Sequence, residues 1–353
     1  MNNSIPDTMQ AVQIDNYGGA VMVRQCPVPK PGRGQVLVRM AAAPINPSDL
    51  SFLRGTYKDQ KPLPAIPGIE GSGRVVAAGP GLFPRVMLGR RVACAASQTS
   101  GGTWAEYMVT SARLCVPLLS AISLEAGAMM AVNPLTALAF FDIAESEKHA
   151  AMVSTAAASA LGRMILRLGQ LNNIPIIAVV RRKDQVDLLR SLGAEYVLDS
   201  SQPDFGLQLG ELTHELRATL LLDAVAGSLT NQLLEAAPAG STVLVYGNLS
   251  GEQCVINARE LLLEGKRVVG FYLANWFANK NLLQSLGVIG KAQRLLGTHL
   301  QTRVQQRLPL SSAREAVALY ENNMSAGKVL LVANAEEIRQ WRLKTMAIED
   351  NGD

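Results

Sequence analysis

Residues 150–162 read Ala150-Ala151-Met152-Val153-Ser154-Thr155-Ala156-Ala157-Ala158-Ser159-Ala160-Leu161-Gly162 and give the clearest indication of the fold. Its first five residues predict a buried strand, and the residues from Ser159 predict a helix that ends near Leu171. Small residues fill the turn between the two, which lets the helix pack closely on the strand. A strand, a short turn and a helix in this order are typical of the start of a βαβ unit.

The same alternation continues along the chain. Further apolar strands are expected at residues 175–180, 196–198, 219–224, 242–246 and 267–273, with helices between them. Near-continuous apolar strands separated by helices predict a parallel sheet that helices cover on both faces. We therefore expect an α/β fold whose doubly wound parallel sheet has the Rossmann architecture of nucleotide-binding domains.

A second domain is expected at the two ends of the chain. From Met9 to about Val116 the sequence consists of short β-like runs broken by Gly and Pro, which predicts a twisted, partly closed β domain. Residues 303–332 have strand, helix and strand character, so the chain is expected to return to this domain. We expect one domain at residues 1–127 and 303–353 and a nucleotide-binding domain at residues 128–302.

Composition excludes several classes of function. The net charge of +4 is small for 353 residues, and the basic residues are scattered, which argues against nucleic-acid binding. No run of about 18 apolar residues predicts a membrane span, and the N-terminus has no signal-like pattern, so a cytoplasmic protein is expected. The four cysteines are isolated and have no histidine nearby, so they predict neither a metal site nor a disulfide framework.

The first strand-to-helix turn is the expected pyrophosphate site, because helix amides and the positive end of the helix dipole point at it. The usual Gly-x-Gly-x-x-Gly is replaced by Ala157, Ser159 and Gly162. Ala and Ser still allow close backbone approach, and Ser159 could donate a hydrogen bond. We expect Ser159, Ala160, Leu161 and Gly162 to contact the cofactor; the alternative is a turn selected only for helix packing.

Basic residues follow the second strand of the nucleotide-binding domain, at Arg181-Arg182-Lys183. An NAD enzyme would place a carboxylate here to hold the ribose 2′-hydroxyl. Arginine can instead hold a 2′-phosphate through paired, charge-assisted hydrogen bonds. Arg181 and Arg182 therefore favour NADP(H), although they could also be solvated charges at the start of a surface helix.

Five short motifs together resemble the medium-chain dehydrogenase/reductase superfamily, from about residue 9 to residue 333. They are Val36-Leu37-Val38-Arg39, Ile45-Asn46-Pro47-Ser48-Asp49-Leu50, Pro67-Gly68-Ile69-Glu70-Gly71-Ser72-Gly73, Gly101-Gly102-Thr103-Trp104-Ala105-Glu106-Tyr107 and Leu192-Gly193-Ala194. The resemblance implies that the β domain is a GroES-like catalytic domain. It also implies a homodimer, paired through the edge strand expected at residues 267–273.

The resemblance also bears on metal. In zinc-dependent members a cysteine lies where Asn46 or Pro47 stands, and a histidine lies where Ile69 stands. The chain therefore resembles the zinc-free branch, which includes quinone oxidoreductases of the zeta-crystallin type and 2-enoyl thioester reductases of the mitochondrial type. We expect no zinc and no metal ligands.

The resemblance implies roles for further residues. Tyr57 would be a hydrogen-bond donor or acid beside the substrate, Asn46 would orient substrate or cofactor, and Trp276 would lie near the nicotinamide. Cofactor contacts would come from Thr136, Gly247, Phe271, Leu273 and Lys328. The alternatives are a surface turn for Tyr57, a turn-capping amide for Asn46, simple packing or a dimer contact for Trp276 and a strand-start lysine for Lys328.

These expectations define a reaction. Hydride from NADPH would reach the β-carbon of an enoyl thioester or enone, and preplaced donors would stabilise the charge that grows on the carbonyl oxygen. Tyr57 suits this role because a phenol with a pKa near ~10 is protonated at neutral pH. The alternatives are an NADPH:quinone oxidoreductase and a catalytically weak NADP-binding or structural protein. The sequence assigns no role to residues 334–353.

Overall fold

The computed structural model describes residues 5–58, 60–97 and 101–334. The chain divides into two compact units, each considered by itself below. One unit comprises the chain up to Val132 together with the chain from Thr302, and the other is Asn133–Gln301. Within the described residues, none of the helices combines the length and the apolar character that crossing a membrane requires.

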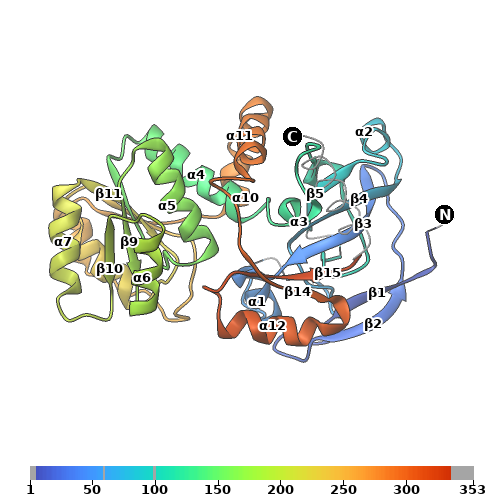
Figure 1. Cartoon of the computed structure of the whole chain (residues 1–353), viewed down its shortest axis with the longest axis horizontal. Coiled ribbons are helices and arrows are strands. Elements are labelled where there is room, and N and C mark those ends of the chain that lie inside the picture. Colours follow the sequence, from blue (N-terminus) through green and yellow to red (C-terminus); the bar gives the residue numbers. More distant parts are fainter. Residues whose placement is uncertain (1–4, 59, 98–100, 335–353) are drawn as a thin grey trace, which may run out of the picture. The chain divides into compact units, whose positions relative to one another are not determined.

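The first unit is mainly β structure (Figure 1). Its larger sheet has the strand order β14-β15-β3-β4-β5-β7, with β6 also paired to β3. The strands are β3 (Gln35–Pro44), β4 (Glu70–Ala78), β5 (Arg91–Ala95), β6 (Tyr107–Ser111), β7 (Cys115–Pro117), β14 (Val304–Pro309) and β15 (Lys328–Val332). A separate antiparallel pair is formed by β1 (Thr8–Gln13) and β2 (Met22–Pro27). Because β15 pairs antiparallel with β3, the last described segment of the chain completes the sheet.

Short helices accompany the sheets of this unit. They are α1 (Pro47–Arg54), α2 (Leu82–Val86), α3 (Leu124–Ala128) and α12 (Ala313–Asn322). A core cluster that includes Ile45, Leu50, Trp104 and Val329 joins β3, α1 and β15. Burying these apolar side chains fixes α1 against the sheet.

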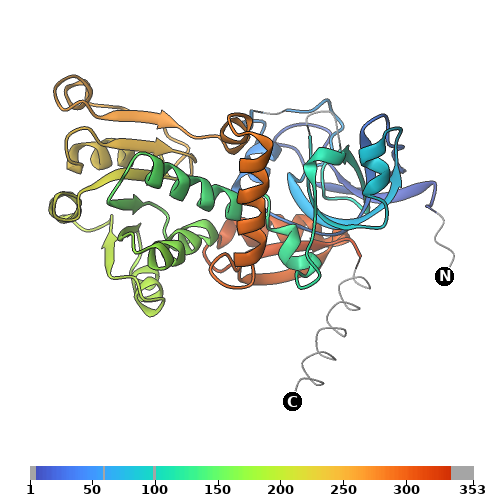
Figure 2. The same ribbon diagram turned by 90° about the horizontal axis from the view of Figure 1, so that it is seen from above.

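The second unit holds a six-stranded sheet of order β10-β9-β8-β11-β12-β13, in which all paired neighbours are parallel. Its strands are β8 (Ala151–Ser154), β9 (Ile176–Val180), β10 (Tyr196–Asp199), β11 (Ala218–Asp223), β12 (Thr242–Val245) and β13 (Arg267–Gly270). Its helices are α4 (Asn133–Ser146), α5 (Ala160–Asn172), α6 (Lys183–Ser191), α7 (Phe205–Glu215), α8 (Ser228–Ala236), α9 (Ala258–Leu263), α10 (Leu273–Ala278) and α11 (Leu282–Leu295). Figure 2 shows the same elements from a second direction. This sheet and its helices confirm the expected doubly wound fold, beside a separate mainly β domain.

One expected strand is shorter than the sequence suggests. The apolar run at residues 267–273 predicts a single strand, but β13 ends at Gly270 and α10 begins at Leu273. The last ladder bond near this point runs from the Phe271 N–H to the Val245 carbonyl. Tyr272 then adopts the extended conformation of a helix N-cap. The predicted strand is too long because Phe271 and Tyr272 have high β propensity although they directly precede a helix.

The turn between β8 and α5 brings the backbone so close to Gly162 that only glycine fits at this position. A Cβ on Gly162 would lie 2.4 Å from the Ala157 carbonyl oxygen, so the backbone itself leaves no room for a side chain. Ala156 adopts a left-handed conformation with φ of 47°. The chain thus turns tightly enough to lay α5 directly over the strand.

We predict that Gly162→Ala lowers the free energy of unfolding by about 1–3 kcal/mol, because the added methyl group forces a backbone shift. Gly206→Ala is the matched control, since Gly206 lies in α7 and a Cβ there would have no other atom within 4 Å. That change should be neutral or should stabilise the helix by up to about 1 kcal/mol. Urea unfolding of both variants measures the difference, and equal stabilities would contradict the packing argument.

Candidate active site and cofactor site

A buried polar network lies at the start of α1 in the β unit, and Asn46 is its centre. Asn46 is almost fully buried. Its Nδ2 donates to Glu70 Oε1 at 3.0 Å, and its Oδ1 accepts a short hydrogen bond from Lys328 Nζ. A lysine can only donate and a carboxylate can only accept, so these two partners fix the orientation of the amide.

Lys328 is only 1% exposed, and its ammonium group is enclosed by acceptors. Besides Asn46, Nζ donates to the Ile45 carbonyl oxygen at 3.0 Å and to the Tyr320 hydroxyl at 3.2 Å. These three acceptors match the three N–H bonds of an ammonium. Lys328 is therefore committed to the protein interior rather than presented on a surface.

Two carboxylates complete the network. Glu70 Oε2 accepts from the backbone N–H groups of Ala131 and Val132, both at 2.9 Å. Asp49 accepts from the Asn46 N–H at 2.8 Å and from the Ile69 N–H at 3.0 Å. The carboxylates thus bind protein donors, and the Ile69 position supplies a backbone N–H where zinc-dependent members would supply an imidazole.

Burial governs the protonation of these carboxylates. It raises the pKa of Asp49 to about 7, against the opposing effects of its backbone hydrogen bonds and of Lys328. Burial also raises the pKa of Glu70, and Lys328 opposes this shift most strongly. The buried ammonium is therefore the main group that stabilises negative charge on Glu70 inside this site.

Tyr57 follows α1 and is half-buried, packed against the core cluster of the β unit. Its N–H donates to the Ser51 carbonyl at 3.2 Å, which continues the helix end. Tyr17, which the sequence did not single out, holds the following loop: its hydroxyl donates to the Lys61 carbonyl at 2.7 Å and accepts from the Lys61 N–H at 2.8 Å. Tyr57 and Asn46 thus lie at opposite ends of one short helix.

The second unit, Asn133–Gln301, is called the nucleotide unit below. In it, Ser159 caps α5. Its Oγ accepts from the Gly162 N–H at 3.0 Å, which leaves the hydroxyl hydrogen available to an anion. Arg163 Nε donates a buried hydrogen bond to the Ala158 carbonyl at 2.8 Å, which stabilises the turn. The first amides of a 13-residue helix, including those of Ala160 and Leu161, therefore begin at a rigid turn of small residues.

A second buried network, which sequence reasoning missed, supports this turn from the neighbouring strand. Asp223, at the end of β11, accepts from the Thr155 hydroxyl at 3.1 Å and from the Thr230 hydroxyl at 2.7 Å. The Thr155 Oγ1 in turn accepts from the Ala224 N–H at 2.8 Å. Two loops at the carboxyl edge of the parallel sheet are thereby fixed, which is the edge where doubly wound sheets bind ligands.

The basic residues after β9 differ in their surroundings. Arg182 pairs with Asp184, with Nε at 3.0 Å from Oδ1. Arg181 is exposed, and its guanidinium forms no ion pair with any residue that the structure describes. Arg181 is the better placed of the two to bind an added phosphate.

The remaining expected contacts lie in the nucleotide unit. Phe271 meets Phe140 of α4 at a centroid distance of 4.9 Å, and Thr136 is buried in the same helix. The ring of Trp276 is covered by Lys280 Nζ at 4.3 Å, and Lys280 also pairs with Asp142 at 2.9 Å. Trp276 is thus anchored within its own unit.

Gly247 and Leu273 are two further residues that the sequence predicts to contact the cofactor. Gly247 follows β12, and a Cβ there would lie 2.7 Å from the Ala224 carbonyl oxygen. Leu273 is the first residue of α10. Both positions lie just after strands of the parallel sheet, beyond their carboxyl ends.

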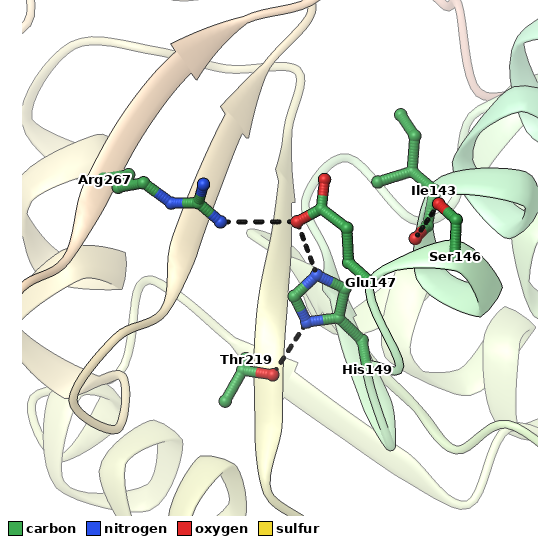
Figure 3. A network of polar contacts seen from close by, with 6 residues as sticks. All are labelled: Ile143, Ser146, Glu147, His149, Thr219 and Arg267. Atoms are coloured by element: carbon green, nitrogen blue, oxygen red, sulfur yellow. Dashed lines mark hydrogen bonds and ion pairs between the residues drawn. The ribbon is translucent and has the colours of Figure 1, made fainter.

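His149 belongs to a different polar network, shown in Figure 3. Its Nδ1 lies 2.8 Å from the Thr219 hydroxyl, and its Nε2 lies 3.4 Å from Glu147, which also meets Arg267 at 3.3 Å. These residues lie near the starts of β8, β11 and β13, the edge of the sheet opposite to the turn between β8 and α5. In the part of the chain that the structure describes, no three His, Cys, Asp or Glu side chains gather in a way that could hold a metal ion.

Comparisons with known proteins agree with this architecture. Residues 32–120 match the alcohol dehydrogenase GroES-like domain, and residues 160–286 match the zinc-binding dehydrogenase family. A crystal structure of a putative NADPH:quinone reductase from Mesorhizobium loti superposes with a TM-score of 0.87 and 34% identity, covering 93% of this chain and 99% of that one. The chain belongs to the medium-chain dehydrogenase/reductase superfamily of oxidoreductases.

Curated relatives add a second activity class. The mitochondrial enoyl-[acyl-carrier-protein] reductase of Mus musculus is 28% identical over 78% of this chain and 75% of its own length. The enzyme of the same name from Arabidopsis thaliana is 29% identical over 69% of this chain and 65% of its own length. The chain thus matches between about two thirds and three quarters of these relatives.

The raised pKa of Asp49 predicts how stability depends on pH. The folded protein binds more protons than the unfolded chain between the ordinary aspartate pKa of 3.8 and about 7. The free energy of unfolding should therefore fall as the pH rises through this window, by up to about 1.4 kcal/mol per pH unit for one proton. Urea unfolding at several pH values should show a smaller slope for Asp49→Asn than for the unmodified protein.

Asp187→Asn is the matched control for this experiment, because Asp187 is an exposed residue of α6 with a 4.0 Å contact to Lys183. It should keep the slope of the unmodified protein. If Asp49→Asn kept that slope as well, Asp49 would be ionised in the folded protein throughout the window.

Proposed function

We propose that the protein is an NADPH-dependent, zinc-independent reductase that transfers hydride to the activated C=C bond of a 2-enoyl thioester or enone, with Tyr57 as hydrogen-bond donor. The observation that carries the proposal is the commitment of Asn46, Glu70 and Asp49 to one another, to Lys328 and to backbone amides. At the positions where zinc-dependent members bind metal, this chain holds neutral or internally paired groups. A donor other than a metal ion is therefore needed, and Tyr57 supplies one.

The residues of the nucleotide unit fit NADP(H). Ser159 and Ala160, at the start of α5, are partly exposed, and the small residues of the turn suit the close approach of a pyrophosphate. Arg181 offers an exposed guanidinium beside the end of β9, where a 2′-phosphate would need a cation. When bound, NADPH supplies the hydride.

The role of this chain is to hold the substrate and to stabilise charge. As hydride reaches the β-carbon, negative charge grows on the carbonyl oxygen of the substrate, and the Tyr57 hydroxyl donates a hydrogen bond to it. Asn46 and Lys328 act indirectly, because they fix the start of the helix that carries Tyr57 at its other end. We propose them as positioning residues, since their polar atoms are engaged within the protein.

Two alternatives follow from other observations. A quinone could be the acceptor, and the 34% identity to a structure named as a putative NADPH:quinone reductase supports this alternative. A protein that binds NADP(H) with little turnover is the third possibility, because the turn has lost two glycines of the usual motif.

Steady-state turnover with NADPH against enoyl thioesters, enones and small quinones tests the proposal. We expect saturable oxidation of NADPH with an enoyl thioester or enone. Turnover with quinones alone would favour the first alternative. A thermal shift with NADPH but no turnover would favour the second, because a ligand that binds only the folded state must raise its stability.

Cofactor preference should depend on the arginines after β9. The double change of Arg181→Ala and Arg182→Ala should weaken NADPH binding by at least about tenfold and leave NADH binding nearly unchanged, because a charge-assisted hydrogen bond contributes about 1.5–3 kcal/mol. Titration calorimetry measures both affinities. Arg190→Ala, an exposed change in α6, is the control, and an unchanged preference in the double variant would remove these arginines from the cofactor site.

Tyr57→Phe should lower kcat for enoyl reduction by about 10²-fold with little change in NADPH affinity, which is the scale of losing one donor to a developing oxyanion. Tyr196→Phe, in β10 of the other unit, is the control and should keep full activity. An unchanged rate for Tyr57→Phe would exclude its hydroxyl from the reaction.

We also propose a homodimer. Its support is that β13 is the last strand of its sheet in the described chain, and that Leu262 and Leu263 of the adjacent α9 are 80% and 67% exposed. A second copy could pair with this edge and cover these side chains. Sedimentation at several concentrations measures the assembly state, and a monomer throughout would refute it. The cytoplasmic location expected from the sequence stays a prediction.

A further inference from the structure

A cavity of about 400 Å³ lies in the β unit, apart from the network around Asn46. Three segments form it: the turn before β3, the loop between β4 and α2, and the residues that follow β6. Its lining consists of Arg33, Gly34, Gln35, Pro80, Gly81, Leu82, Phe83, Pro84, Ser111 and Arg113. We call it the arginine pocket.

The arginine pocket is separate from the candidate active site. Gln35 is the first residue of β3, whereas Asn46 follows the last residue of the same strand. The strand is 10 residues long, so at about 3.3 Å per residue its two ends lie roughly 30 Å apart. A molecule in the pocket would not touch the Asn46 network.

Backbone hydrogen bonds hold the walls of the pocket together. The Gly34 N–H donates to the Pro80 carbonyl at 3.0 Å, and the Ala112 N–H donates to the Gly34 carbonyl at 3.0 Å. Next to the lining residues in sequence, a Cβ on Gly79 would lie 1.8 Å from the Gly32 carbonyl oxygen, so two of these chain segments meet at backbone distance. The three segments are therefore locked to one another before any ligand binds.

The charged residues that line the pocket are all positive. Arg33 and Arg113 come from different segments and line the same cavity, and no acidic residue belongs to the lining. Neither guanidinium forms an ion pair with the residues that the structure describes, unlike Arg24, which pairs with Asp15 at 2.7 Å. Two guanidinium groups without a carboxylate partner suit a carboxylate or a phosphate ligand.

The other side of the pocket is apolar. Leu82 is 82% exposed and Phe83 is 50% exposed, and Val86 and Leu88, a few residues further along the chain, are exposed as well. Large apolar side chains gathered in this way on a surface mark an interaction site. The lining thus combines two arginines with two apolar side chains, which suits a ligand that has both an anionic group and an apolar part.

We propose that the arginine pocket binds a small amphipathic anion, with its carboxylate or phosphate held by Arg33 and Arg113 and its alkyl part lying on Leu82 and Phe83. A cavity of this size is at the lower end of the range for small-molecule sites. This volume suits a single small molecule. This site is independent of the reductase activity proposed above.

Fluorescence anisotropy with a dansyl-labelled undecanoate, kept below its micelle concentration, tests the proposal with the full chain. We expect saturable binding with one probe per chain and competition by decanoate, but little competition by inorganic phosphate or by decanol at the same concentration. The double change of Arg33→Gln and Arg113→Gln should weaken binding at least about tenfold. Leu82→Ser should weaken it as well.

The control is Arg314→Gln, because Arg314 is an exposed residue of α12 outside the pocket lining. It should bind the probe like the unmodified protein, and urea unfolding should confirm that all variants are folded. Equal binding by the double arginine variant would overturn the proposal. So would competition by phosphate as strong as that by decanoate, or binding to anionic phosphatidylglycerol vesicles without binding of the monomeric probe.

Discussion

The structure of the β unit depends on balancing the buried ammonium of Lys328 against the buried carboxylate of Glu70. An uncompensated charge in a protein interior costs several kcal/mol, so Lys328 and Glu70 are stable only together. Asn46 makes this possible, because its amide accepts from the lysine on one side and donates to the glutamate on the other. Compensation of these charges therefore brings the start of α1, the start of β4 and the start of β15 together at Asn46. Burial raises the pKa of Asp49 to about 7, so this neighbouring group holds its proton more readily than an exposed aspartate.

Much of the remaining site follows from this point. Glu70 also binds the two amides directly before α4, so the network fixes the place where the chain leaves the β unit. α1 runs from the network to Arg54, and Tyr57, the proposed donor, follows it and is tied to the helix end through the Ser51 carbonyl. The nucleotide unit uses the same principle at Asp223, where one buried carboxylate holds two loops beside the cofactor turn.

The sequence was sufficient for the doubly wound sheet, because its strands are continuous apolar runs with helical periods between them. It was also sufficient to select Asn46 and Lys328, but each from a local motif and for separate roles. Their direct contact joins residues 282 positions apart, and no local pattern encodes it. Asp49 and Tyr320 were missed for the same reason, while the strand at residues 267–273 was overextended because Phe271 and Tyr272 favour strands wherever they occur.

The buried charges of Glu70 and Lys328 stabilise each other through Asn46. A double-mutant cycle with Glu70→Gln and Lys328→Met, followed by urea unfolding at neutral pH, measures this coupling. Each single change should cost about 3–5 kcal/mol, and the double variant should be more stable than the sum of the two losses implies, by about 0.5–3 kcal/mol. Strictly additive losses would show that the two charges do not compensate each other and would contradict the account.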